Sequence, residues 1–181
     1  VPGGSPPIRS LQGLERARYL TSLVVNDQAL TSVVVPTNWA NLRKLELRRN
    51  ALTNLQWEGT PPWLETLDVR NNALPALNLP PGLLSLRMLL ASSNQLTRAE
   101  MPADLNAVET WVLDDNRIAE FVLPAHAIPR YLGLAGNPLT RFDSVEPPRS
   151  IRQLNLSRTR LADFGFLGGL TSLERLELSD M

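Results

Sequence analysis

A frame of apolar positions repeats along most of the chain, and each copy is centred on one residue that is usually an asparagine. If this residue is numbered zero, apolar side chains stand eight, five and three residues before it and two and five residues after it. The frame fits eight times, with zero positions at Gln28, Asn50, Asn72, Asn94, Asn116, Asn137, Thr159 and Met181. They are 22 residues apart, except for one spacing of 21. Self-similarity at this period predicts a solenoid.

The segment before each zero position alternates as a short strand does. Residues at minus five and minus three are expected to point inward, and those at minus six, minus four and minus two to point outward. In this register Leu45 and Leu47 are core residues, whereas Glu46 faces outward. The predicted strands pair in one parallel sheet, with centres near Val24, Glu46, Asp68, Leu90, Val112, Gly133, Asn155 and Glu177.

The recurring asparagine comes where the strand ends and the chain turns inward. Backbone groups lose their strand partners there, and a side-chain amide can both donate to them and accept from them. We therefore predict a structural ladder, not a binding site, from Asn50, Asn72, Asn94, Asn116 and Asn137. Gln28 and Thr159 depart from the pattern, so the ladder is in question at those two coils.

The segments that return from one strand to the next carry prolines. These are Pro36, Pro61, Pro62, Pro80, Pro81, Pro102, Pro124, Pro147 and Pro148. Proline lacks an N–H and disfavours helix at the residue before it, so the return side is expected to be extended or polyproline-like, with turns. The last return segment, "LGGLTSLERLEL", has no proline and can form a short helix or 3₁₀ turn.

Copies such as "LRKLELRRNALTNL" and "LETLDVRNNALPAL" resemble the leucine-rich repeat family from Leu20 to the C-terminus. The resemblance implies an α/β-class solenoid, a curved horseshoe with one parallel β-sheet on its concave face and mostly extended, 3₁₀ or turn segments on its convex face. "TPPWLETLDV" and "LPPGLLSL" are similar to the proline-marked short repeats of bacterial type III effectors, some of which carry ubiquitin-ligase domains. Extracellular regions of receptor-like proteins and kinases from simple eukaryotes have similar short repeats, and the terminal coil resembles the 22-residue internalin and phosphatase-regulator type, so the lineage stays open.

The frame also divides the chain. Residues 1–19 are expected to be a leader and partial N-terminal cap, because Leu11, Leu14 and Leu20 can lie over the open end of the first coil. Residues 20–181 are expected to form eight repeats, of which the last is truncated at Met181. Solenoids normally cover their terminal coils, so the natural protein is expected to continue.

Composition and charge narrow the classes of partner. Eighteen basic and eighteen acidic residues cancel, so no global field favours nucleic acid. No apolar run approaches the roughly 20 residues that cross a bilayer, and "VPGGSPPIRS" has none of the charged-then-apolar layout of a signal peptide. Without cysteine the chain has no disulfides. The localisation stays open, with a secreted effector acting in a host cell or a cytoplasmic protein as the favoured alternatives.

The chain offers little for catalysis or metal binding. His126 is the only histidine, and no second histidine or cysteine is present to share a metal with it. Asp114 and Asp115 lack the further carboxylates of a calcium loop and are interpreted as a solvated strand end. We expect no catalytic residue, no metal site and no cofactor, and therefore no enzyme within these residues.

The outward positions of the sheet suggest where a partner binds. Met88, Leu90, Val112 and Tyr131 form an apolar group, and small Gly133 and Ala135 are expected to leave room beside it. A contiguous exposed apolar group usually marks an interface. We predict that this group anchors a protein partner or a self-association contact, oriented by Arg48, Arg70 and Asp114. The alternatives are that Leu90 is buried by a local irregularity, or that a terminal segment covers the group.

Two functions follow from this pattern. The favoured one is a non-catalytic module for protein–protein interaction, the concave-face recognition domain of a larger effector or receptor-like protein. The alternative is a substrate-selecting or autoinhibitory domain of an enzyme, a ubiquitin ligase or a kinase, whose catalytic domain lies beyond this chain.

Overall fold

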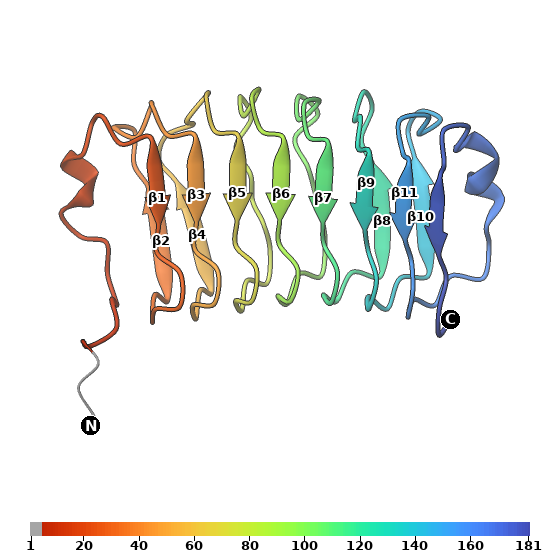
Figure 1. Ribbon diagram of the computed structural model, residues 1–181, viewed down its shortest axis with the longest axis horizontal. Helices are drawn as coiled ribbons and strands as arrows, with labels where there is room; N and C mark the ends of the chain where they lie inside the picture. The colour runs from red at the N-terminus through yellow and green to blue at the C-terminus, as the bar shows by residue number, and fades with distance from the viewer. Residues whose placement is uncertain (1–4) are drawn as a thin grey trace.

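A computed structural model describes residues 5–181 as a solenoid of short strands joined by turns (Figure 1). Two 3₁₀ helices, η1 (Leu14–Arg16) and η2 (Gly165–Gly169), lie near its two ends. The strands are β1 (Ser22–Val24), β2 (Ser32–Val35), β3 (Lys44–Glu46), β4 (Asn54–Trp57), β5 (Thr66–Asp68), β6 (Met88–Leu90), β7 (Thr110–Val112), β8 (Glu120–Leu123), β9 (Tyr131–Gly133), β10 (Arg141–Ser144), β11 (Gln153–Asn155) and β12 (Arg175–Glu177). No helix in this part of the chain is long and apolar enough to cross a membrane.

Eight of these strands form the main sheet, in the order β1-β3-β5-β6-β7-β9-β11-β12, with every pair parallel (Figure 1). All eight predicted strands are present, and each predicted centre is the last residue of its strand. The predicted register is confirmed, because Leu45 and Leu47 are fully buried while Glu46 is only partly buried. The leucines of successive coils pack into one continuous core behind the sheet.

The return side holds two further sheets that the sequence did not lead us to expect. β2 pairs with β4 and β8 pairs with β10, again in parallel. The predicted extended conformation is therefore correct, but in four coils it is organised into paired strands. The last return segment forms η2, which confirms the short 3₁₀ turn.

A second recurring conformation accompanies the turn. The residue just before each zero position has a positive φ, between 51° and 66°, in all eight coils: Asp27, Arg49, Asn71, Ser93, Asp115, Gly136, Arg158 and Asp180. This left-handed conformation costs roughly 1–2 kcal/mol for most residues and suits glycine, asparagine and aspartate best. Arg49 and Arg158 adopt it nonetheless, and each pairs with an aspartate of another coil, Asp27 or Asp115.

Asn94 illustrates the hydrogen bonds that the predicted ladder asparagines make. Its Oδ1 accepts the N–H of Leu74 at 3.0 Å, and its Nδ2 donates to the carbonyls of Val69 at 3.0 Å and Ala91 at 3.1 Å. Leu74 and Val69 belong to the preceding coil, so one amide joins two coils. The same three bonds recur at Asn50, Asn72, Asn116 and Asn137.

Gln28 and Thr159, which stand at zero positions in place of asparagine, differ in their hydrogen bonds. Gln28 has a longer side chain, and its Oε1 accepts the N–H of Ile8 at 2.8 Å, as a ladder asparagine would. Thr159 donates to the carbonyl of Leu156 in its own coil at 2.8 Å. Within residues 5–181 its hydroxyl makes no hydrogen bond to the preceding coil, so the ladder is interrupted there.

The N-terminal segment is attached to the second coil. The Trp39 indole N–H donates to the carbonyl of Leu14 at 3.0 Å, and the Asn38 and Asn41 amides donate to the carbonyls of Glu15 and Arg18. These contacts support a cap, although the domain boundary at residue 20 stays a prediction. The first four residues of the predicted leader lie outside the described residues.

We predict that replacing Asn94 with alanine lowers the free energy of unfolding by about 1–3 kcal/mol, because buried backbone groups of two coils lose their partner. Denaturant titration measures the change. Asn78 is exposed on the return side, so Asn78→Ala is the matched control and should have little effect. An unchanged midpoint for Asn94→Ala would contradict the structural role.

We predict that Thr159→Asn raises the free energy of unfolding by about 1 kcal/mol. The new amide would lie near the Leu139 N–H and the Leu134 carbonyl of the preceding coil. These two groups are equivalent to those that the other ladder asparagines bond. Thr159→Val, which keeps the side-chain volume without an amide, should instead be destabilising because it loses the bond to Leu156. The idea fails if the asparagine variant melts at or below the temperature of the parent.

Candidate interaction surface

The candidate site is the outer face of the main sheet, formed by the residues at minus six, minus four and minus two of each coil. In the part of the chain that the structure describes, no strand or helix packs over this face. Neighbouring strands align its residues in columns: Met88 pairs with Thr110 and then Tyr131. In the next column the aligned residues are Leu90, Val112 and Gly133.

The predicted apolar group is only partly exposed. Met88 is 40% exposed, and Val112 and Tyr131 are half-buried. The prediction was wrong for Leu90, which is only 8% exposed. Strands lie about 4.8 Å apart, so a side chain in the middle column is covered by its register partners, here Asp68 and Val112. Leu90 therefore packs between neighbouring side chains of the face and is not available to contact a partner.

The room expected beside Gly133 is also filled. The Asp114 carboxylate lies over this glycine, and a Cβ at Gly133 would stand 2.6 Å from its Oδ2. Asp114 Oδ1 accepts the N–H of Ala135 at 2.8 Å. The interpretation of Asp114 as a solvated strand end was therefore wrong, because a missing side chain on the next strand lets the carboxylate fold down onto the sheet.

The partly buried position of the Asp114 carboxylate has an electrostatic cost. Burial raises the pKa of Asp114 above its ordinary value, and the Asp115 carboxylate adds to the rise. The bond from Ala135 and the charge of Arg158 oppose it. Burial also raises the pKa of Tyr131, helped by the carboxylates of Asp114 and Glu177. Asp114 and Tyr131 therefore share a partly desolvated environment on neighbouring strands.

The two predicted arginines, Arg48 and Arg70, differ in whether their charges are already paired within the chain. Arg70 makes two bonds to Asp68, at 2.6 and 2.9 Å, and Asp68 is 2% exposed. Its charge is therefore already satisfied inside the chain. The Arg48 backbone N–H donates to Asn26 Oδ1, but its guanidinium forms no ion pair among residues 5–181. The Arg48 Nε is buried without a hydrogen-bond partner.

Sequence reasoning missed one ion pair at the rim of the face. Asp115 and Arg158 are 43 residues apart and bond at 3.0 Å, across an intervening coil. Gly136 stands between them, and a Cβ there would collide with Asp115 Oδ1. The signal available in the sequence was the glycine at the position where other coils have a side chain.

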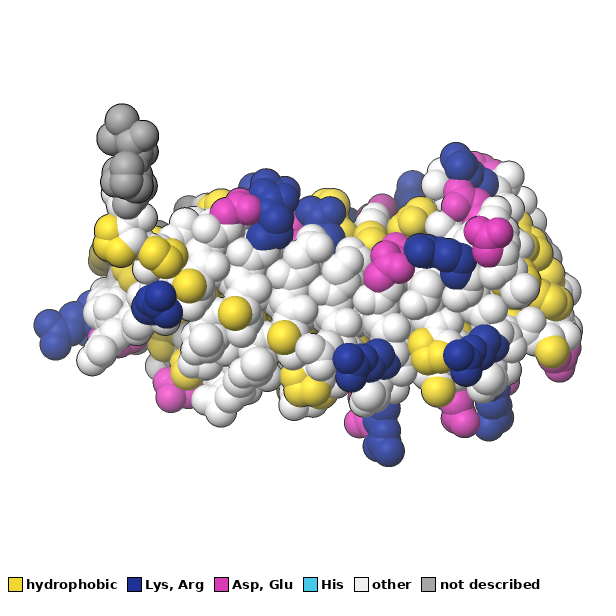
Figure 2. All heavy atoms as spheres, turned by 90° about the horizontal axis from the view of Figure 1, so that it is seen from below, with side chains coloured by type: hydrophobic (Ala, Val, Ile, Leu, Met, Phe, Trp, Pro, Cys, Tyr) yellow, Lys and Arg dark blue, Asp and Glu magenta, His cyan; other side chains and the backbone are white. Residues whose placement is uncertain are grey.

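The edge of the molecule at which the main strands end is mostly uncharged (Figure 2). Its Lys and Arg side chains gather with Asp and Glu in small mixed groups, so that no single-sign field extends over this edge. This agrees with the zero net charge of the chain and offers no surface of the kind that nucleic-acid backbones select.

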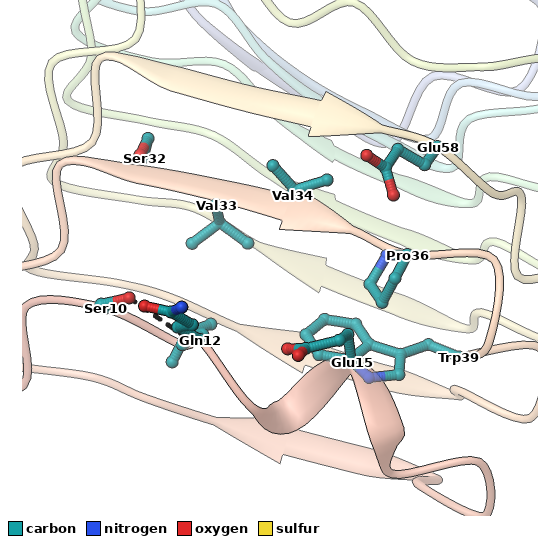
Figure 3. Close-up of a pocket in the computed structure, with 10 residues that line it drawn as sticks. Ser10, Gln12, Glu15, Ser32, Val33, Val34, Pro36, Trp39 and Glu58 are labelled. Carbon is teal, nitrogen blue, oxygen red and sulfur yellow. Dashed lines mark hydrogen bonds between the residues drawn. The ribbon is translucent and has the colours of Figure 1, made fainter.

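A pocket of about 310 Å³ lies between the N-terminal segment and β2 (Figure 3). Glu15 and Glu58 contribute its carboxylates, and Glu15 accepts the N–H of Gly13 at 2.6 Å. The lining includes no histidine or cysteine, so it holds no Ser–His or Cys–His pair. Across residues 5–181, no group of three His, Cys, Asp or Glu side chains could hold a metal ion.

No protein-family model matches the chain, and no curated protein matches its sequence. Solved structures do match. An internalin of Listeria monocytogenes, InlF, aligns with a TM-score of 0.63 at 16% identity, over 99% of this chain and 60% of its own. A leucine-rich-repeat protein of Leptospira interrogans aligns with a TM-score of 0.50 at 22% identity, over 92% of this chain and 56% of its own.

The functional domain of Listeria monocytogenes InlJ, which includes a cysteine ladder, also aligns, with a TM-score of 0.50 at 16% identity, over 96% of this chain and 52% of its own. This chain has the leucine-rich-repeat fold, as its sequence predicted. It spans little more than half the length of each of these chains. The finer similarity to type III effector repeats stays a prediction.

We predict that Asp114→Asn makes the protein more stable at neutral pH. The pKa of Asp114 is raised on folding, so the folded state holds its proton more tightly than the unfolded state does. Its ionisation therefore lowers stability as pH rises from about 3.8 through the folded pKa, and this loss is absent below that window. An asparagine oxygen can still accept from Ala135.

The measurement is denaturant unfolding of both proteins between pH 3 and 8, in which the gain should appear only as pH rises. Asp115→Asn is the control, because it removes the ion pair with Arg158 and should give no such gain. An Asp114→Asn variant that is less stable than the parent at pH 7 would show that the carboxylate is stabilising instead.

Proposed function

We propose that this chain is a non-catalytic recognition module that binds another protein through the outer face of its main sheet. The observation that carries the proposal is a sheet face with partly exposed Met88, Val112 and Tyr131 at its middle and charged groups on both sides. Large apolar side chains at the centre of a polar rim are the usual layout of an interaction hot spot. The eight repeats of residues 20–181 supply a rigid support for it.

The revised contact set is smaller than the sequence suggested. Met88 and Tyr131 flank Thr110 on three neighbouring strands, and Val112 lies in the next column. Leu90 is buried between its register partners Asp68 and Val112, and Arg70 is held by Asp68. Of the predicted orienting charges, this leaves Arg48 and Asp114 available for a partner.

We further propose that the module belongs to a larger effector or receptor-like protein. The internalins that share its fold extend well beyond the aligned part, which is compatible with such an arrangement. The alternative is that the same face selects substrates or masks the active site of an enzyme elsewhere in the full protein. Both alternatives use the same face, so one experiment on this face serves both.

We predict that the paired change Met88→Ser with Tyr131→Ser weakens binding by about 2 kcal/mol, or roughly 30-fold, because it removes the apolar centre of the contact. The probe is a peptide selected on the 181-residue chain from a randomised 12-residue display library, and the readout is its Kd. Both side chains are at least partly exposed, so the melting temperature should change little.

The control places the same change on the return side, where Val122 is 51% and Val145 is 64% exposed. Val122→Ser with Val145→Ser should leave the Kd unchanged. If the selected peptides instead lose affinity for this control and keep it for the sheet variant, the partner surface is the return side and the proposal is wrong.

A further inference from the structure

The charged residues on the outer face of the main sheet are mostly paired within their own strand. Lys44 with Glu46 and Arg175 with Glu177 each approach to 2.7 Å, and Asp68 with Arg70 to 2.6 Å. The pattern is simple, because residues two apart on a strand point to the same face. Eight charged residues occupy the outward positions of the described chain, and only Arg48 and Asp114 among them lack an ion-pair partner.

Each of the two remaining charges is incompletely satisfied. The Arg48 guanidinium is partly buried, with a buried Nε that has no hydrogen-bond partner. One Asp114 oxygen accepts from Ala135, but no cation bonds the carboxylate, and burial raises its pKa. A buried donor without a partner costs free energy, and so does a desolvated charge. Arg48 and Asp114 are both partly exposed, so they are the two charges of this face that a partner of opposite charge can pair.

The two charges have a defined separation. Both occupy the minus-two position of their coils, and their strands β3 and β7 are three steps apart in the order β3-β5-β6-β7. At about 4.8 Å per step, the two positions are about 14 Å apart. In an extended chain with about 3.3 Å per residue, this distance corresponds to four residues, and residues four apart on a strand point the same way.

The shape of the face favours a single extended segment over a second copy of the chain. From minus six to minus two the face is about 13 Å wide, and eight strands make it about 34 Å long. Two such faces in contact would bury about 900 Å² in total, below the roughly 1,200 Å² of stable interfaces. One extended segment laid across the strands would bury a similar area, which is typical of a weak or transient contact and too small for a stable dimer.

We propose that the partner presents an extended segment across the strands, with an acidic side chain on Arg48 and a basic side chain, four residues away, on Asp114. This proposal rests on the proposed function and names the chemistry of its partner. Val112 lies two residues before Asp114, at the end of β7, and Tyr131 is close enough for the Asp114 carboxylate to raise its pKa, so the basic end of the segment carries these apolar contacts. Opposite charges at a fixed spacing set the direction of the segment along the solenoid.

The test uses library peptides whose binding to the 181-residue chain is lost in the Met88→Ser with Tyr131→Ser variant. Their Kd is measured by fluorescence anisotropy against Arg48→Gln and Asp114→Asn. We expect each change to weaken binding about tenfold or more, because each removes one member of a partly desolvated charge pair. The selected peptides should contain an acidic and a basic residue four positions apart.

The chain offers a matched control for each variant. Arg49 and Asp115 are the sequence neighbours of the two residues, but they are exposed and already paired, with Asp27 and Arg158. Arg49→Gln and Asp115→Asn should change the Kd less than about twofold. Replacing the basic residue of the peptide by alanine should abolish the effect of Asp114→Asn, which assigns the pair by a double-mutant cycle.

Two results would overturn the inference. If face-specific peptides bind Arg48→Gln and Asp114→Asn as tightly as the parent, the two charges take no part, while the proposed function stands. If sedimentation equilibrium shows a dimer at micromolar concentration that either variant dissociates, the two charges pair with a second copy and not with a separate segment.

Discussion

The solenoid depends on satisfying the backbone groups at the point where each strand ends and the chain turns into the core. One buried amide does this for two coils at once, because Asn94 and its equivalents accept from one coil and donate to both. A left-handed residue just before the asparagine makes the turn possible. Both features require the same position in every coil, so they hold the repeat near 22 residues and keep all strands in register.

The constant register determines what the outer face can be. Equivalent positions of all coils fall into straight columns, so a side chain has neighbours from its own strand and from the strands on either side. Charges two apart on one strand neutralise each other, as Asp68 and Arg70 do. A charge without such a partner stays unpaired on a regular grid. The spacing of unpaired charges along the solenoid is therefore set by the same backbone bonds that hold the coils together.

How far the sequence predicts this structure depends on the range of the interaction. The strands, the core and the ladder positions follow from side-chain period within one coil, and they were predicted correctly. The burial of Leu90 and the fold of Asp114 onto Gly133 depend on what stands one coil away. The pairing of β2 with β4 likewise depends on two return segments together. A frame that treats every coil alike cannot show such differences between neighbours.

The two sides of the sheet have different roles, which explains how the outer face can hold charged groups that lower stability. Stability comes from the leucine core and the asparagine bonds, which lie behind and below the strands, and neither involves the side chains of the outer face. An unpaired carboxylate such as Asp114 therefore lowers stability locally without disturbing the register. Because the neighbouring position is a glycine, the carboxylate is held in one place by Ala135 rather than left free in solvent. A charge that is both fixed and unpaired is already oriented for a partner of opposite sign, so little side-chain entropy is lost when the two meet.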